Sequence, residues 1–522
     1  MSTLDWFVIG GYLLGMLALA VYLGRRQSSR NDYYLGANHL PSWSLATSIV
    51  ATQCSTNSLL GAPAFVGFVI GGGMLWLQYE LAVPLAMLAL CVLFIPIRRS
   101  GVISIYGFLE QRLGLESRLL ASACFLFFRG VATGVTVYGV ASIIGLVTGI
   151  SYTTAVVILM GITVAYDTLG GMRAVVISDV AQMLLLTAAV VFTLVGLAPG
   201  LVEHYGELAA RRDTLVADWG IRSGNNYGFW PMLIGGFFLY TAYYGCDQSQ
   251  AQRLLAARDE VETRRILALN GMLRFPLVLA YCLLGLGLAA YAIDHGDFIA
   301  SLPRTADGDA NLNLVFPAYV AREFAPGLAG LAIVGLFAAA MSSIDSALNS
   351  LSASSIEDFV ARFRPLDERR LFLASKLATL FWGVFAIFFS YQVENIAPTV
   401  LEAINKVGSM ANGPLLALFC TAVLLPAVGQ RAAITGFCLG LAANLAAWQW
   451  LPGLSWLWWN VLGFGVGMLI TLLLAAGRAI SWPSSPGGLL PRPQTLQLTM
   501  MTGLILLTCL ALEFFGQGPI RQ

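Results

Sequence analysis

Long apolar segments follow one another along almost the whole chain, separated by short polar connections. A bilayer crossing takes roughly 20 apolar residues in a helix, and the sequence supplies about fourteen segments of that length or longer. The pattern therefore predicts an all-α integral membrane protein that spans the lipid bilayer about fourteen times. The expected spans are 5–24, 43–72, 74–97, 119–149, 151–169, 173–199, 228–247, 264–293, 325–357, 370–394, 397–425, 430–451, 457–476 and 496–515.

Two of these segments contain residues that interrupt helices, namely the segments 43–72 and 228–247. The first carries Gly61–Pro63 and Gly67, and the second carries Gly235–Gly236 and Gly245–Gln248. Broken helices at matching places in two halves of a transporter indicate a binding site near the middle of the membrane. Glycines that only allow close helix packing are the alternative.

Each of these two segments opens a block of five expected spans. We therefore expect one transmembrane transporter domain, 1–522, built from a leading helix, two five-helix halves and three trailing helices. These parts are 5–24, 43–199, 228–425 and 430–515.

Charge supports this arrangement and orients it. With the N-terminus outside, the expected inner connections hold nineteen arginines, Arg253 among them, and the outer ones hold six. Inner loops of membrane proteins carry such an excess. The first apolar segment lacks a basic leader, which favours a retained helix over a cleaved signal. The expectation is a multi-pass protein of the plasma membrane, or of the inner membrane in a bacterium.

Composition narrows the class of function. The chain has 522 residues, of which 58% are hydrophobic and 11% charged, and its net charge is +1, so nothing indicates a nucleic-acid partner. Its eight cysteines lie in or beside apolar segments and its three histidines fall in expected loops. Neither a nucleophile–base pair nor a metal-ligand cluster stands out, so we expect no enzyme activity and no organic cofactor.

One apolar segment carries a polar stripe at helical spacing. Its members recur three and four residues apart and would share one helix face: Ser342, Asp345, Ser346, Asn349 and Ser350. A carboxylate among hydroxyls inside a membrane is costly unless a cation lies against it. The stripe favours a sodium site, whereas serines that bond only to the preceding turn are the alternative.

Several short stretches, taken together and in this order, resemble the sodium:solute symporter family, which includes sodium–glucose, proline, sialic acid and monocarboxylate carriers. They are Ala51–Gly61, Tyr106–Leu113, Gly170–Gln182, Asp247–Arg253, Ser342–Ser350 and Asn405–Pro414. The resemblance implies the leucine-transporter fold with two inverted five-helix repeats. It also implies sodium-coupled symport of a small polar solute by alternating access. A proton-coupled carrier is the first alternative, and a sensor or channel on this scaffold is the second.

The resemblance also implies sodium ligands. The first site would use carbonyl or hydroxyl oxygens of Ala51, Cys54, Ala339, Ser342 and Ser343. A second site, or a sodium path, would add Asp179, Asp345 and Ser346. Asp345 departs from the family, whose members with a second ion tend to have a hydroxyl residue there. Two carboxylates would attract a cation strongly, or one would stay protonated beside the other, which leaves proton coupling open.

Substrate ligands are implied on the same basis. The expected set is Gln53, Ser58, Glu80, Tyr240, Tyr243, Arg274 and Asn405. Glu80 and Arg274 as a purely structural ion pair are the alternative. Arg129 and Lys406 are further cations inside apolar segments, and neither is assigned to the substrate. The solute is expected to be an organic anion, a sugar or a polyol-like molecule, carried by a chain that functions as a monomer.

Overall fold

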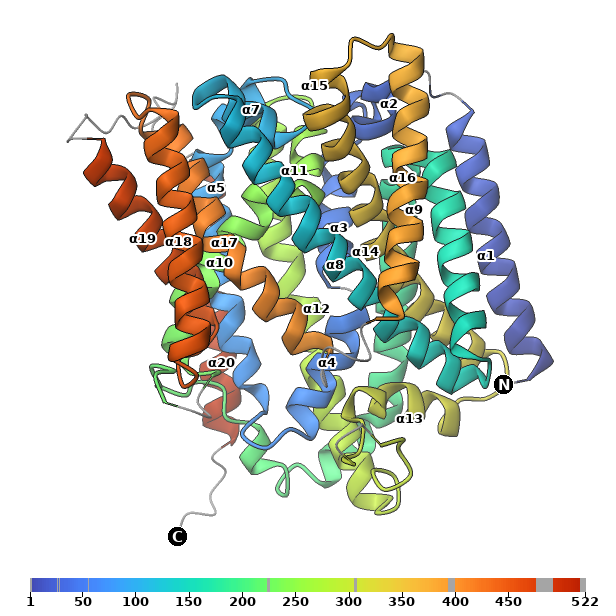
Figure 1. Ribbon diagram of the computed structural model, residues 1–522. Helices are drawn as coiled ribbons and strands as arrows, with labels where there is room; N and C mark the ends of the chain where they lie inside the picture. The colour runs from blue at the N-terminus through green and yellow to red at the C-terminus, as the bar shows by residue number, and fades with distance from the viewer. Residues whose placement is uncertain are drawn as a thin grey trace.

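The computed structural model describes residues 2–25, 27, 29–54, 56–222, 226–304, 308–392, 400–475 and 492–516, without the side chains at 37, 57, 146, 400–407, 515 and 516. Within these ranges the backbone is helical and forms no β-sheet, apart from an isolated bridge between Arg304 and Ala310. Figure 1 shows long helices side by side, with α1 at one edge and α18 to α20 at the opposite edge.

Ten helices of the described chain are long and apolar enough to cross a membrane. They are α1 (Thr3–Gly24), η2 with α5 (Met74–Leu81 and Ala82–Leu93), α8 (Leu115–Thr148), α9 (Tyr152–Glu203), α12 (Glu260–Asp294), α14 (Leu328–Ser354), α16 (Glu368–Ser390), α18 (Gln430–Trp450), α19 (Leu457–Leu474) and α20 (Arg492–Gly516).

Breaks and bends explain why ten long helices stand where about fourteen spans are expected. α9 contains both expected spans 151–169 and 173–199, and bends at Gly171, whose φ of 54° favours glycine. Two other expected spans consist of shorter pieces. These pieces are α3 (Ser42–Gln53) with α4 (Thr56–Gly67), and η4 (Pro231–Gly235) with α10 (Gly236–Cys246). The last expected span without a long helix of its own is 397–425, which contains α17 (Val400–Leu424), a helix that the structure describes in part. The number of crossings stays a prediction.

One of the two breaks falls in a stretch from which we expect it. Gly61 and Pro63 lie inside α4, and Gly235 and Gly236 continue one helix, so a break at these residues is wrong, whereas the break in the second half falls within Gly245–Gln248 as expected. The chain leaves the helix instead at Cys54 (φ −80°, ψ 53°), directly after α3. In the other half it leaves at Asp247 (φ −92°, ψ 120°), between α10 and α11 (Gln248–Leu255). Asp247 Oδ1 then accepts from the Ser249 backbone N–H at 2.8 Å and starts the new helix.

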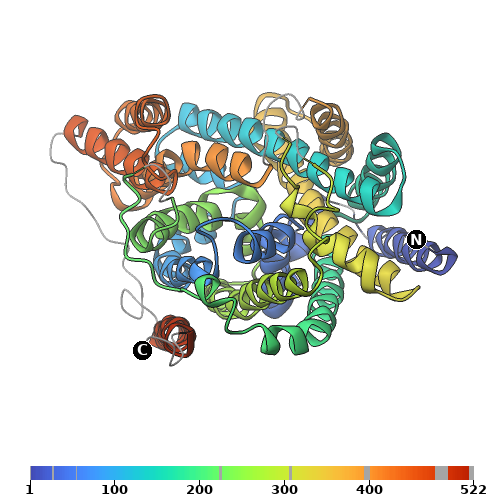
Figure 2. The same cartoon turned by 90° about the horizontal axis from the view of Figure 1, so that it is seen from below.

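Close packing accounts for one of the glycines. A Cβ atom on Gly67 would lie 2.5 Å from the Gly285 carbonyl oxygen, and one on Gly285 would lie 2.8 Å from the Pro63 carbonyl oxygen. α4 and α12 therefore approach each other as only glycines allow. Viewed along the helix axes, α3 and α4 lie in the middle of the bundle (Figure 2).

α1 is fixed to the helix that carries the polar stripe. Its buried Asp5 accepts hydrogen bonds from the backbone N–H groups of Gly327 (2.7 Å) and Gly330 (2.8 Å) at the start of α14. A carboxylate at a helix N-terminus satisfies free donors and complements the helix dipole. Asp5 therefore couples the position of α14 to that of α1.

Short helices complete the fold at the two ends of the bundle. They are α2 (Arg30–Leu35), η1 (Gly36–Asn38), α6 (Ile95–Arg99), α7 (Ile105–Arg112), η3 (Ala209–Arg211), η5 (Leu312–Leu314), α13 (Val315–Glu323), η6 (Ser355–Val360) and α15 (Ala361–Phe363). α2, α7 and α15 lie at one end of the bundle, which we call the α2 end, and α13 lies at the other (Figure 1).

A histidine joins the ends of α9 and α12. His204 Nδ1 lies 3.0 Å from Glu207 Oε1, and its Nε2 lies 2.7 Å from Asp294 Oδ1. Because carboxylates only accept, the doubly protonated ring suits both contacts. Hydrogen bonds to Glu207 and then to Asp294 raise the pKa of His204 above its ordinary value of 6.5.

This histidine predicts a pH-dependent stability. A raised pKa in the folded protein means that the stabilisation is fully present below about pH 6.5 and is lost as the pH rises through the folded value. Thermal unfolding of the purified protein across this range should show the loss. In His204→Gln the difference from the wild type should be largest at low pH and vanish at high pH. Parallel curves at every pH would contradict the assignment.

Candidate functional site

Hydroxyls of α14 meet the free end of α3 in the middle of the bundle. Ser342 Oγ lies 3.3 Å from the Ala51 carbonyl oxygen and 3.0 Å from the Ala339 carbonyl oxygen. Ser343 Oγ lies 3.0 Å from the Thr52 carbonyl oxygen and 3.5 Å from that of Ala339. Carbonyls in the last turn of a helix lack partners within the helix. The hydroxyls of α14 provide those partners here.

We call the oxygens of Ala51, Ala339, Ser342 and Ser343 the candidate sodium locus. The fifth expected ligand, the Cys54 carbonyl, accepts from the Tyr281 hydroxyl of α12 at 3.3 Å. Carbonyl and hydroxyl oxygens suit a small hard cation, and the C-terminal end of a helix adds partial negative charge. The residues therefore fit a sodium ion held between α3 and α14.

An arginine lies among the residues expected to form the second sodium site. Arg253 Nη2 donates to Asp179 Oδ2 at 3.2 Å and also to the Ser346 hydroxyl. Its Nε donates to Ser48, whose hydroxyl donates in turn to Asp179. Arg253 is buried within the helix α11, so its expected place in a connection between helices is wrong, while the side of the membrane on which it lies stays a prediction. The guanidinium already supplies a cation to Asp179 and Ser346.

Asp345 lies one turn from Ser342 on α14 and has a different environment. Its Oδ1 accepts from the backbone N–H of Ser346 at 2.6 Å. The other oxygen, Oδ2, is buried and has no hydrogen-bond partner among the described residues. The Ser346 hydroxyl, which Arg253 contacts, also donates to Asp345 Oδ1 at 3.3 Å, so Asp345 borders the Arg253–Asp179 pair but has no ion pair of its own among the described residues.

A cavity of about 200 Å³ with polar, aromatic and aliphatic lining residues lies beside the candidate sodium locus, and Ser343 contributes to its wall. Five of the expected substrate residues line it: Gln53, Ser58, Tyr240, Tyr243 and Arg274. Aromatic and hydroxyl side chains complete the wall, including Trp76, Tyr79, Tyr281, Thr133 and Thr136. The side chain of Asn405 lies outside the described part, so its role stays a prediction.

Glu80 is expected to contact the substrate, but the structure places it behind Arg274. Arg274 Nε donates to Glu80 Oε2 at 2.7 Å, and its Nη2 donates to Glu80 Oε1 at 2.8 Å and to the Tyr240 hydroxyl at 2.6 Å. The carboxylate is 1% exposed and is not among the residues that line the cavity. The geometry is that of a bidentate ion pair that fixes the cavity wall.

Arg129 on α8 is a cavity residue that the expected set omits. Its guanidinium lies 5.8 Å above the Tyr243 ring and donates to the Ser249 hydroxyl at 2.5 Å. Its closest carboxylate oxygen, Asp247 Oδ2, is 3.7 Å from Nη1, and its Nε has no hydrogen-bond partner in the described structure. The signal in the sequence was its position, because a cation inside an apolar segment is costly without a role.

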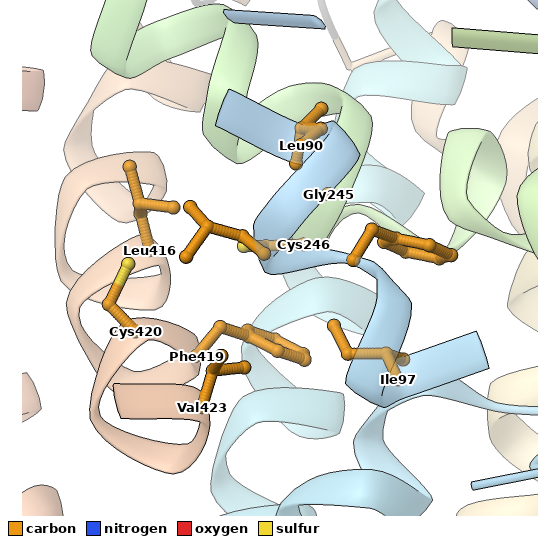
Figure 3. A pocket seen from close by; sticks show the side chains of 10 residues that line it. Leu90, Ile97, Gly245, Cys246, Leu416, Phe419, Cys420 and Val423 are labelled. Atoms are coloured by element: carbon orange, nitrogen blue, oxygen red, sulfur yellow. The ribbon is translucent and has the colours of Figure 1, made fainter. Parts of the chain in front are cut away.

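A second, apolar crevice lies between α5, α6, α10 and α17 (Figure 3). Leu90, Cys246 and Phe419 are among its lining residues, and the free volume is about 10 Å³. That volume is at most the space of one water molecule, and the side chains of the described lining residues are apolar apart from the thiols of Cys246 and Cys420. We interpret the crevice as packing and not as a binding site.

The broken helix, the oxygen-rich locus and the adjoining cavity define a helical membrane transporter. The family model of the sodium:solute symporter family matches residues 33–440. The chain belongs to this family, which confirms the resemblance drawn from the sequence. The family and the relatives below are transporters, so transport across a membrane with sodium as the coupling ion is the activity that the family shares.

Similar proteins support the same class. The sodium/sialic acid symporter SiaT of Proteus mirabilis is 27% identical over 475 residues, which cover 88% of this chain and 92% of that protein. The sodium-coupled monocarboxylate transporter 1 of Xenopus laevis is 27% identical over 456 residues, covering 84% and 71%. A solved substrate-bound, outward-open structure of a Na⁺-coupled sialic acid symporter covers 92% of this chain with a TM-score of 0.83 at 23% identity. That likeness shows the leucine-transporter-type fold.

Proposed function

We propose that this chain imports a small organic anion together with sodium by alternating access, with the ion held at the candidate sodium locus. The observation that supports this most directly is the contact of Ser342 and Ser343 with the free carbonyls at the end of α3. Sodium that binds one conformation more tightly than the other shifts the carrier toward that conformation. Reciprocity then requires that bound solute raise the affinity for sodium.

The arrangement of the chain in the membrane follows from the same proposal. Residues 43–199 and 228–425 act as two inverted halves, and α3–α4 and α10–α11 are the broken first helices of these halves. The α2 end faces the cytosol, and the N-terminus lies outside. One chain contains the whole site and works as a monomer.

One sodium ion per cycle fits the residues best. Asp179 and Ser346, expected in a second sodium site, are already bound by Arg253. A second cation at that place would have to approach a guanidinium, and like charges in a low-dielectric interior repel strongly. We therefore assign the coupling ion to the candidate sodium locus alone.

The charge of the cavity wall favours an anionic solute. Arg129 and Arg274 line the cavity, and no Asp or Glu is among its described lining residues. Glu80 neutralises Arg274 at short range, whereas Arg129 has a carboxylate only at 3.7 Å. Arg129 is therefore the group that would bind a carboxylate of the solute. Sialic acids and short monocarboxylates, the cargo named for the relatives, both carry one.

The sodium assignment is tested by Ser343→Ala. Losing one ligand of the ion costs about 1.5–3 kcal/mol, which corresponds to a roughly 10- to 150-fold weaker apparent sodium affinity. The measurement is the rise of the melting temperature with Na⁺ at constant ionic strength, with choline as the replacement cation. Solute uptake into proteoliposomes should show the same shift.

Ser350→Ala is the matched control for this experiment. Ser350 lies on the same helix, α14, and is fully buried, whereas Ser343 is partly buried; the Ser350 hydroxyl donates to the Ala347 carbonyl at 2.9 Å. Its removal should leave the apparent sodium affinity unchanged. An unchanged affinity in Ser343→Ala, or an equal loss in both variants, would refute the site.

A further inference from the structure

A groove lies between the start of α3 and the part of α9 that follows its bend, at the α2 end of the bundle. We call it the α3–α9 groove. Its free volume is about 250 Å³, several times the space of one water molecule. Its wall is formed in part by His39, Leu40, Trp43, Arg173, Ile177 and Val180. Neither the solute cavity nor the candidate sodium locus uses any of these residues.

Arg173 brings an unpaired positive charge to this groove. Its side chain is exposed, and no hydrogen bond or ion pair joins it to another described residue. The His39 imidazole is also exposed and has no hydrogen-bond partner in the described part of the chain. No Asp or Glu is among the described lining residues, since Glu262, which accepts from the Ser42 hydroxyl at 3.2 Å, lies outside the wall. The charge of the groove therefore suits an anion.

Other arginines at the same end of the bundle bind carboxylates of the protein itself. Arg30 pairs with Glu357 at 2.6 Å, and Arg118 pairs with Asp358 at 2.8 Å. Arg173 has no such partner among the described residues. A counter-ion for Arg173 therefore comes from outside the described chain.

The groove lies where the polar end of the bundle meets its apolar surface. Trp43 and Arg173 are the first residues of two segments expected to span the bilayer, 43–72 and 173–199. Trp43 is exposed, and tryptophan is enriched where lipid hydrocarbon meets the headgroups. Basic pockets between helices at this level bind the headgroups of anionic lipids.

An apolar strip leads from Arg173 along α9. Ile177, Val180 and Leu184 follow Arg173 at spacings of four, three and four residues, so they share its face of the helix. Leu184 is 68% exposed, although it lies well inside the expected span 173–199. Such a strip suits an acyl chain and offers nothing to a free inorganic anion.

We propose that the α3–α9 groove binds one anionic phospholipid, whose phosphate accepts from Arg173 and His39 while an acyl chain follows the strip from Ile177 to Leu184. The bound lipid joins the first turn of α3 to the part of α9 beyond Gly171 and stabilises their relative position. This lipid site requires neither the solute nor the candidate sodium locus, so its test is independent of theirs.

The test compares two lipids with identical acyl chains on the purified full chain in neutral detergent. Phosphatidylglycerol should raise the melting temperature more than phosphatidylcholine does. In Arg173→Gln the half-saturating concentration of phosphatidylglycerol should rise roughly fivefold or more, the factor that one basic side chain contributes at a membrane surface. The melting temperature without lipid should stay unchanged, because Arg173 has no partner in the described fold.

Two further measurements support the same assignment. Arg173→Lys keeps the charge and should keep most of the response, whereas His39→Gln should weaken it in the same direction as Arg173→Gln. Native mass spectrometry of protein purified from membranes that contain phosphatidylglycerol should show one retained lipid in the wild type. Arg173→Gln should retain less of it.

Arg369→Gln is the matched control. Arg369 is exposed in the first turn of α16, which begins at the α2 end, where Glu368 pairs with Arg30 at 3.0 Å, and it lies outside the groove. Its replacement should leave the lipid response unchanged. Equal stabilisation by the two lipids, or an equal loss in Arg369→Gln and Arg173→Gln, would overturn the site. Stabilisation by inorganic phosphate at the same concentration would also overturn it, since the groove would then bind a free anion.

Discussion

Replacing Arg253 with glutamine is expected to lower the free energy of unfolding by about 3–5 kcal/mol, because the change leaves Asp179 buried without its cation. The guanidinium is 1% exposed and contacts Ser48, Asp179 and Ser346, which belong to three different helices. Its loss therefore removes the contact that holds α3, α9 and α14 together beside the candidate sodium locus. Thermal or chemical unfolding of the purified carrier measures the effect.

A double variant separates the ion pair from simple loss of packing. Asp179→Asn alone also destabilises, since it leaves Arg253 unpaired. Arg253→Gln with Asp179→Asn should be more stable than the sum of the two single losses, because neither partner is then left charged. Additive losses would contradict the pairing. Arg99→Gln is the control for a partly exposed pair, because the Arg99–Glu260 contact near the surface should contribute at most about 1 kcal/mol.

Arg129→Gln is expected to reduce uptake of an anionic solute at least roughly 30-fold while leaving the fold intact. Truncating one partner of a buried charge pair costs about 2 kcal/mol or more, and about 1.4 kcal/mol corresponds to a factor of ten. Arg129 contacts Ser249 and the face of Tyr243, and its nearest carboxylate, Asp247, lies 3.7 Å away and keeps its hydrogen bonds from Ser249 when Arg129 is replaced. Sodium-dependent uptake of labelled sialic acid and of a short monocarboxylate is the measurement.

Glu80→Gln provides the contrast, because Glu80 pairs with a cavity cation without lining the cavity. Its replacement leaves Arg274 buried and unpaired, which costs about 3–5 kcal/mol of stability. The defect should thus appear in unfolding before it appears in the solute affinity. Normal anion uptake in Arg129→Gln would contradict the assignment of the solute carboxylate to Arg129. A selective loss of solute affinity in Glu80→Gln would indicate that Arg274, the partner of Glu80, binds this carboxylate instead.

Local periodicity predicted the parts of this protein that depend on one helix. The spacing of Ser342, Asp345, Ser346 and Asn349 is a property of a single α-helix, and the structure gives that segment one continuous helix, α14. The apolar lengths likewise predicted most spans. They did not predict the break at Cys54, because no glycine or proline stands at that position. The break instead leaves carbonyls free to meet hydroxyls of α14.

Contacts between distant segments were beyond such reasoning. Arg253 follows a polar stretch and resembles a loop arginine, and only the packing of α11 against α3 and α14 buries it. The places of Glu80 and Arg129 relative to the cavity differ from the expected ones for a similar reason. The rotation of each helix about its axis decides which side chain reaches the cavity, and apolar segments with weak periodicity leave that rotation undetermined.

Tyr281 connects the cavity with one of the expected sodium ligands. Its ring lines the cavity, and its oxygen donates to the Cys54 carbonyl, one of the ligands expected for sodium. An ion that takes this carbonyl as a ligand competes with the hydroxyl for it, and a tyrosine thus released is free to turn toward cargo. Binding of the ion and a change in the shape of the cavity are then coupled through one shared atom, the Cys54 carbonyl oxygen.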